Sequence, residues 1–179
     1  MKIGIAGIGG LGSNVARYLA QAGLPHLKIV DFDRVEISNL NRQFYSIDQA
    51  GNLKTLSLAQ NLLGIFPDMI IEPIDCRMEP KDAIRLFFDC DIVVEGFDNT
   101  AAKKMLIEEL ADSGKQVVSA SGISGEEMEG VGVKNLGNCH IVGDFVSDMD
   151  AMPLFPPKIG LVASLMAGIV LKLVKESKK

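Results

Sequence analysis

Short apolar runs alternate along the chain with longer segments in which apolar residues recur every three or four positions. The short runs predict β-strands at 2–6, 27–31, 69–74, 91–95 and 116–120, the first of them buried. The longer segments predict helices at 11–22, 53–65, 81–88, 101–113 and 159–175. Gly23 gives the first helix a stop signal, and Pro67 lies just beyond the second.

The remaining segments are richer in glycine and polar residues. Residues 34–49 are expected to be irregular, with room for a short helix near Leu40. The segment 122–143 predicts two antiparallel strands, at 130–134 and 138–142, and 144–157 a loop. Strands that alternate with helices of this length predict a mainly parallel sheet, continued by the antiparallel strands and covered by helices on both faces. We therefore expect an α/β three-layer sandwich, with residues 1–179 as a single domain.

Composition narrows the class of protein. The net charge of −5 argues against a nucleic-acid partner, which is normally met by a basic face. The three cysteines are far apart and form no Cys-x-x-Cys pair, which disfavours a structural zinc site and suits a reducing cytoplasm. The chain opens without a signal peptide, and its most membrane-like segment, 159–170, is shorter than the roughly 20 residues of a membrane span. We expect a cytoplasmic protein with no membrane partner.

A glycine loop is the first chemical motif. Gly7, Gly9 and Gly12 form G-x-G-x-x-G directly after a predicted strand and at the start of a helix, as a Rossmann-like nucleotide site requires. Its backbone N–H groups can donate hydrogen bonds to phosphates, and the helix dipole attracts their negative charge. Asp31 ends the next strand, where a carboxylate accepts hydrogen bonds from ribose hydroxyls. A tight turn that binds nothing is the alternative, and the motif alone leaves the kind of nucleotide open.

Two cations narrow the choice of nucleotide. Arg42 follows the segment Ser-Asn-Leu-Asn, whose side chains can order a loop, and Lys54 falls in the first turn of the next helix. Both follow the acidic strand end and can fold back over the phosphate site. An arginine fork and a lysine charge neutralise the outer oxygens of a triphosphate. Each could equally be a solvated surface charge.

The pair Asp98-Asn99 follows the fourth predicted strand. Ligands of open parallel sheets lie beyond the carboxyl ends of the strands, so Asp98 is placed to hold a magnesium ion that bridges phosphates. The alternative is that these residues only cap the following helix. Taken together, Arg42, Lys54 and Asp98 are the candidate catalytic residues.

These motifs, in this order, resemble the ThiF/MoeB/HesA family of bacterial relatives of ubiquitin-activating enzymes. The resemblance rests on Gly-x-Gly-Gly-Leu-Gly-Ser, Asp-Phe-Asp-x-Val-x-x-Ser-Asn-Leu-Asn-Arg-Gln, Lys54, Asp98-Asn99 and the closing Pro157-Lys158-Ile159-Gly160. It implies an ATP site built from Gly10, Asp31, Ser38, Asn39, Leu40, Asn41, Arg42, Lys54, Asp98 and Asn99, with Asp98 as the ligand of Mg²⁺. It also implies adenylation of the C-terminal Gly-Gly carboxylate of a ubiquitin-like sulfur carrier such as ThiS or MoaD, with release of pyrophosphate, and a homodimer.

The chain departs from the family pattern in three respects. Many members hold zinc on two Cys-x-x-Cys pairs and carry a cysteine in the loop before the last helix, whereas this chain has neither, so no zinc is expected. Cys139 lies beside His140 on a predicted strand, which places the two side chains on opposite faces and indicates a structural cysteine. The chain also starts directly at the first strand. This pattern resembles the short, divergent ThiF branch associated with thiamine biosynthesis.

Three other functions remain open. An NAD- or FAD-dependent oxidoreductase would use the glycine loop and Asp31, but would leave Arg42, Lys54 and Asp98 without a joint role. A non-catalytic module that binds a ubiquitin-like partner would not need those three residues. A tRNA-modifying dehydratase of the same superfamily fits poorly with the net charge of −5.

Overall fold

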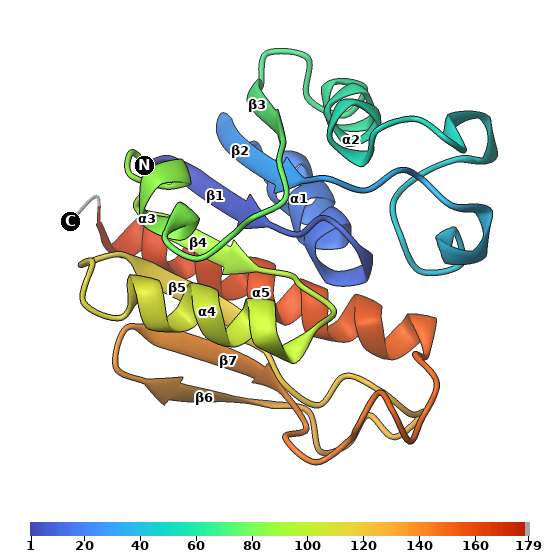
Figure 1. Cartoon of the computed structure of the whole chain (residues 1–179), viewed down its shortest axis with the longest axis vertical. Coiled ribbons are helices and arrows are strands. Elements are labelled where there is room, and N and C mark those ends of the chain that lie inside the picture. Colours follow the sequence, from blue (N-terminus) through green and yellow to red (C-terminus); the bar gives the residue numbers. More distant parts are fainter. Residues whose placement is uncertain (178–179) are drawn as a thin grey trace.

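The computed structural model describes residues 1–177 and forms one seven-stranded sheet in the order β3-β2-β1-β4-β5-β7-β6 (Figure 1). The strands are β1 Ile3–Ala6, β2 His26–Asp31, β3 Ile70–Asp75, β4 Ile92–Glu95, β5 Gln116–Ala120, β6 Gly132–Leu136 and β7 Cys139–Gly143. The central strands β1 and β4 are buried along their whole length, as expected for continuous apolar runs covered on both faces.

The sheet is parallel except at one edge. Strands β1 to β5 pair in parallel, and β7 also runs parallel to β5. Only β6 is antiparallel, as the first strand of a hairpin with β7 that turns at Gly137. The structure therefore confirms the α/β sandwich and the antiparallel pair, and adds that β7 keeps the direction of the main sheet.

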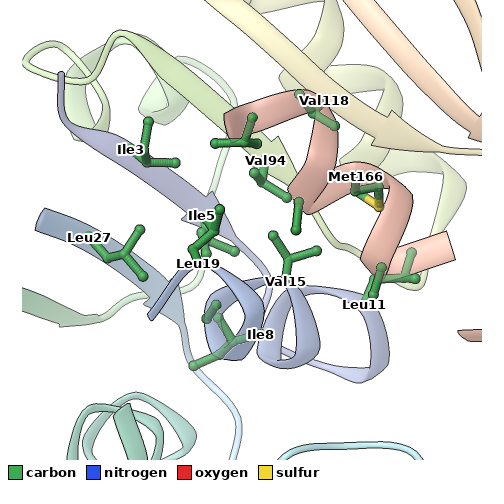
Figure 2. Close-up of a cluster of buried hydrophobic side chains, with 14 of the residues drawn as sticks. Ile3, Ile5, Ile8, Leu11, Val15, Leu19, Leu27, Val94, Val118 and Met166 are labelled. Atoms are coloured by element: carbon green, nitrogen blue, oxygen red, sulfur yellow. The ribbon is translucent and has the colours of Figure 1, made fainter. Parts of the chain in front are cut away.

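In the part of the chain that the structure describes, five α-helices cover the sheet: α1 Gly10–Gln21, α2 Lys54–Leu63, α3 Asp82–Leu86, α4 Thr100–Leu110 and α5 Pro156–Glu176. One face carries α1, α2 and α5, and the other carries α3 and α4 (Figure 1). Figure 2 shows the larger core between α1 and the sheet, where Ile5, Leu19 and Val94 meet. These residues come from β1, α1 and β4, so the same packing fixes the glycine loop between β1 and α1.

The last helix is longer than the sequence predicts. It begins at Pro156 rather than at Ile159, because proline is well suited to the first turn of a helix, and it runs for 21 residues. Helix α5 is thus long and apolar enough to cross a membrane by length and composition, which corrects the expectation that this segment is too short. Here its buried stripe, which includes Met166, packs against α1 and the sheet (Figure 2).

The segment between β2 and α2 is largely irregular, as predicted. It contains two short 3₁₀ turns, η1 Ile37–Asn39 and η2 Ile47–Gln49, the first just before Leu40. An isolated bridge between Arg34 and Leu53 closes its base. The segment projects from the sheet beside α1 (Figure 1).

Candidate functional site

A cleft of about 470 Å³ lies at the carboxyl edge of the sheet. The strand order places the ends of β3, β2, β1 and β4 next to one another, and Figure 1 shows the arrowheads of β1, β2 and β4 directed to the same side. The cleft lies at the ends of these strands, as ligand sites do in open parallel sheets. Nine of the residues singled out from the sequence line it: Gly7, Gly9, Gly10, Asp31, Asn39, Arg42, Lys54, Asp98 and Asn99.

The glycine loop forms the floor of the cleft beside the N-terminus of α1. Gly7 has a φ of +79°, a conformation that residues with a Cβ rarely adopt. Gly12 does not line the cleft, because it lies beneath the loop, where a Cβ would come 2.0 Å from the carbonyl oxygen of Gly7. Gly12 therefore lets the helix approach the strand closely, and Gly9 and Gly10 present the helix N-terminus to the cleft.

Asp31 is almost fully buried at the end of β2, and both of its carboxylate oxygens already accept backbone hydrogen bonds. Ile8 N–H donates to Oδ2 and Asp33 N–H donates to Oδ1, each over 2.8 Å. Burial raises the pKa of Asp31, while these two N–H groups act in the opposite direction. Each oxygen retains a further lone pair, so the carboxylate can still accept a hydrogen bond from a ligand in the cleft.

The side chain of Arg42 is held by the turn that precedes it. Its guanidinium donates to Asn39 Oδ1 over 2.6 Å, to Asn41 Oδ1 over 2.9 Å and to the carbonyl oxygen of Ser38 over 3.3 Å. The side-chain amide of Asn14 donates to the carbonyl oxygens of Gly10 and Arg42, which ties this turn to the glycine loop.

Not every residue of the Ser-Asn-Leu-Asn segment faces the cleft. Ser38, Leu40 and Asn41 do not line it, whereas Asn39 and Arg42 do. The carbonyl oxygen of Ser38 and Oδ1 of Asn41 instead accept hydrogen bonds from the guanidinium of Arg42. Their contribution to the site therefore passes through Arg42.

Lys54 and Asp33 form an ion pair at the edge of the cleft. Lys54 is the first residue of α2 and is nearly buried, and its Nζ donates to Asp33 Oδ2 over 2.8 Å. The backbone N–H of Lys54 also donates to the carbonyl oxygen of Asp33. Asp33, whose side chain is about half exposed, thus holds both the ammonium group and the backbone N–H of Lys54.

Asp98 and Asn99 have different roles in the structure. Asn99 is the N-cap of α4, and its Oδ1 accepts a hydrogen bond from Ala102 N–H over 2.8 Å. Asp98 lines the cleft and is exposed, and its carboxylate takes part in none of the hydrogen bonds or ion pairs found within residues 1–177. The capping interpretation thus applies to Asn99, and Asp98 is left facing the cleft.

A buried carboxylate that the sequence analysis missed holds the Asp98 turn. Glu95 is fully buried at the end of β4, and it accepts hydrogen bonds from Phe97 N–H over 2.7 Å and from Ser119 Oγ over 2.6 Å. Lys103 of α4 pairs with the same carboxylate. The sequence did contain a signal for this role, since Glu95 ends an apolar run. A carboxylate is almost never fully buried without a partner, so a glutamate at that position indicates a buried ion pair.

Other cleft residues were also missed. Arg77 follows β3, and its guanidinium lies over the ring of Phe32, 4.8 Å from the ring centre. One wall of the cleft is apolar and comes from Ile123, Leu154 and Ile159. Ile123 and Leu154 lie in segments that carry no recognisable motif, and Ile159 belongs to the closing Pro157-Lys158-Ile159-Gly160 segment, so only the tertiary fold brings the three together.

The cysteines are not grouped. Cys139 is buried on β7, and burial raises the pKa of its thiol to about 11, which agrees with a structural role. Cys76, by contrast, lines the cleft. Within residues 1–177, no three His, Cys, Asp or Glu side chains gather closely enough to hold a metal ion by themselves.

Comparison with curated proteins shows relatives across nearly the whole chain. The adenylyltransferase and sulfurtransferase UBA4 of Candida glabrata is 34% identical, over 97% of this chain and 42% of its own length. The adenylyltransferase and sulfurtransferase MOCS3 of Dictyostelium discoideum is 30% identical, over 98% of this chain and 43% of its own length. The chain thus spans about two-fifths of the length of these relatives.

Solved structures agree on the fold. The tRNA N6-threonylcarbamoyladenosine dehydratase of E. coli, in complex with AMP, superposes with a TM-score of 0.89 at 19% identity, covering 99% of this chain and 88% of that one. E. coli MccB with succinimide gives a TM-score of 0.77 at 21% identity, covering 98% of this chain and 56% of that one. The family model described as the ThiF family matches residues 1–179. The chain therefore belongs to the ThiF family.

Proposed function

We propose that residues 1–179 form one adenylation domain, which uses ATP and Mg²⁺ to activate the C-terminal Gly-Gly carboxylate of a ubiquitin-like sulfur carrier of the ThiS or MoaD kind. One observation carries this proposal. A helix N-terminus, two cations and an uncommitted carboxylate, that of Asp98, face one cleft. These are the groups needed to bind a triphosphate with its metal.

We infer the orientation of ATP in the cleft from the order of the strands. Phosphate binds at the N-terminus of α1, after β1, where Gly9 and Gly10 offer backbone N–H groups. Asp31, after the neighbouring β2, accepts from the ribose hydroxyls. The base then lies toward the end of β3, near Phe32 and Arg77, and the outer phosphates lie toward Arg42 and the end of β4.

Arg42 and Lys54 stabilise the charge that develops on the departing pyrophosphate. The guanidinium of Arg42 is positioned in advance by three hydrogen bonds, so little reorganisation is needed when charge develops. Lys54 adds a second positive charge at the edge of the cleft. Asn39, which bonds the guanidinium and lines the cleft, orients Arg42.

The residues present also fit a magnesium ion. Mg²⁺ in nucleotide sites keeps several waters and is bound through one or two carboxylates together with the phosphates, so a cluster of three protein ligands is not required. Asp98 would hold the ion. When bound, Mg²⁺ neutralises phosphate charge and favours departure of pyrophosphate. Glu95, through Phe97 N–H and Lys103, fixes the turn that carries Asp98.

The carboxylate substrate would enter along the apolar wall formed by Ile123, Leu154 and Ile159. A carboxylate is ionised at neutral pH, so its attack needs no general base. One carboxylate oxygen bonds to the α-phosphorus of ATP. The bond from that phosphorus to the oxygen bridging the α- and β-phosphates breaks, and its electron pair leaves with pyrophosphate. The product is an acyl-adenylate, and the protein acts by alignment and electrostatic stabilisation.

The relatives support the adenylation step, since both carry adenylyltransferase in their names. Within this function we assign the chain to thiamine biosynthesis, on its resemblance to the short ThiF branch. We assign the sulfur-transfer step to another protein, because residues 144–157 before α5 contain no cysteine and Cys139 is buried with a raised thiol pKa. We also propose a homodimer, in which the half-buried apolar side chains of α5 such as Leu165 and Ile169 contact the partner.

The proposal is tested by ATP–pyrophosphate exchange with a panel of Gly-Gly carriers, with and without Mg²⁺. We expect exchange that requires both a carrier and the metal, and that does not occur with a carrier lacking its last glycine. Binding of ATP without exchange for any carrier would favour a non-catalytic binding module. Tight binding of NADH in place of ATP would favour an oxidoreductase and would overturn the proposal.

A further inference from the structure

The start of α5, next to the cleft wall, contains a fully buried lysine that the proposed mechanism does not use. Lys158 lies in the first turn of α5 and has no exposed surface. Its Nζ donates to the carbonyl oxygen of Ser124 and to Asp144 Oδ2, each over 2.6 Å. The segments that contain Ser124, Asp144 and Lys158 therefore meet at this ammonium group.

The pair is built into the fold rather than formed at the surface. Only 8% of the Asp144 side chain is exposed, and its second oxygen, Oδ1, accepts from the backbone N–H groups of Val146 and Ser147. Gly122 leaves the space for this carboxylate, since a Cβ there would come 2.0 Å from Oδ1. A buried ion pair whose remaining lone pairs are satisfied holds its surroundings in one geometry.

Each of the three joined segments carries a residue of the apolar wall. Ile123 precedes Ser124, and Ile159 follows Lys158. The third segment starts at Asp144 and returns to Ser124 at Leu154, through an isolated antiparallel bridge. The ammonium of Lys158 thus lies behind the wall and joins the backbones that form it.

We propose that Lys158 is a positioning residue, which together with Asp144 fixes the wall against which the C-terminal tail of the carboxylate substrate lies. This inference rests on the proposed function and deepens it, because it assigns the binding of the tail to the apolar wall, whose Ile159 lies beside Gly10 of the glycine loop. Neither partner of the pair bonds to Asp31, Lys54 or Asp98. Loosening the pair therefore weakens tail binding much more than ATP binding.

The experiment compares Lys158→Met and Asp144→Asn with the wild type and with Lys172→Met, a change at an exposed lysine of the same helix. Exchange kinetics give KM for the carrier, calorimetry gives Kd for ATP, and hydrogen exchange reports on residues 145–154. In both pair variants we expect carrier KM to rise at least tenfold, ATP Kd to stay within twofold, and amide exchange in 145–154 to accelerate. Lys172→Met should match the wild type in all three.

The double variant Lys158→Met/Asp144→Asn covers the case in which a single change fails to fold. It leaves no buried charge unpaired, so its unfolding midpoint should exceed that of either single variant. Its carrier KM should stay raised, because the link to Ser124 is still missing. This separates positioning from stability.

Two different results would overturn this inference, and they show whether the proposed function fails with it. Folded pair variants with wild-type carrier KM, alongside normal wild-type turnover, would overturn this inference alone. A wild type that binds ATP but shows no carrier-dependent exchange would overturn the proposed function, and this inference with it.

Discussion

The ammonium group of Lys54 lies 2.8 Å from the carboxylate of Asp33, and the backbone of Lys54 bonds to that of Asp33 as well. Asp33 in turn donates its N–H to Asp31. The second aspartate of the Asp-Phe-Asp motif, whose role the sequence leaves open, therefore links the candidate ribose acceptor to a candidate phosphate-binding lysine. Asp33 therefore holds Asp31 and Lys54 in a fixed position relative to each other.

Lys54→Met should weaken ATP binding by about tenfold to 100-fold, because a charge-assisted hydrogen bond to phosphate contributes about 1.5–3 kcal/mol. Asp33→Asn keeps the charge of Lys54 and an oxygen that can accept its hydrogen bond, and removes only the negative charge of the partner, so it should weaken binding by less. Calorimetry with ATP and Mg²⁺ measures both. ATP binding to Lys54→Met as tight as to the wild type would remove this lysine from the site.

Asp98 and Asn99 give a matched pair of changes. Asp98→Ala should lower exchange by at least about 100-fold, the effect expected when a group that stabilises transition-state charge is lost. It should leave the free energy of unfolding within about 0.5 kcal/mol. Asn99→Ala removes the N-cap of α4 and should cost about 1 kcal/mol of stability. Exchange rates and urea unfolding measure the two effects, and an active Asp98→Ala protein would contradict the metal assignment.

Alanine substitutions at Gly12 and Gly168 compare a tightly packed glycine of the glycine loop with an unpacked glycine of α5. A Cβ at Gly12 meets backbone at 2.0 Å, so Gly12→Ala should lower the free energy of unfolding by about 3 kcal/mol or disrupt the ATP site. Gly168 lies in the interior of α5, where a Cβ meets nothing within 4 Å, and Gly168→Ala should stabilise the protein by about 0.5–1 kcal/mol. Equal effects of the two changes in urea unfolding would contradict the close helix–strand approach.

Cys76 should be the cysteine that alkylating reagents reach. It lines the cleft, whereas burial raises the thiol pKa of Cys139 to about 11 and that of Cys90 to about 12. Iodoacetamide at pH 8 should label Cys76, and saturating ATP with Mg²⁺ should slow the reaction. Peptide mass spectrometry measures the labelling. Modification of Cys139 at a comparable rate would reopen a role for it in sulfur transfer.

The sequence predicts the sheet, the glycine loop and the position of Lys54 at the start of a helix, because local patterns determine each of them. Periodicity places the strands, and glycine spacing marks the strand-to-helix turn. Asp31 lies at the end of β2, as the alternation of strands requires.

The rest depends on tertiary contacts. Pro156 is better suited to the first turn of a helix than to a loop, so α5 begins earlier than the apolar pattern indicates. Which residues of the Ser-Asn-Leu-Asn segment face the cleft depends on a 3₁₀ turn of three residues, Ile37–Asn39, which is too short to give a periodic signal. The burial of Lys158 does not show in the sequence, because only the fold brings Asp144 and Ser124 to it.

The central claim is that this cleft joins AMP to a carrier carboxylate. Intact-mass spectrometry of Gly-Gly carriers from the same organism, incubated with the protein, ATP and Mg²⁺, measures that product directly. We predict a carrier whose mass rises by one adenylyl group (AMP less one water), at its C-terminal glycine, only when ATP and Mg²⁺ are present and not with Asp98→Ala. Carriers that stay unmodified while the protein binds ATP and Mg²⁺ would contradict the account.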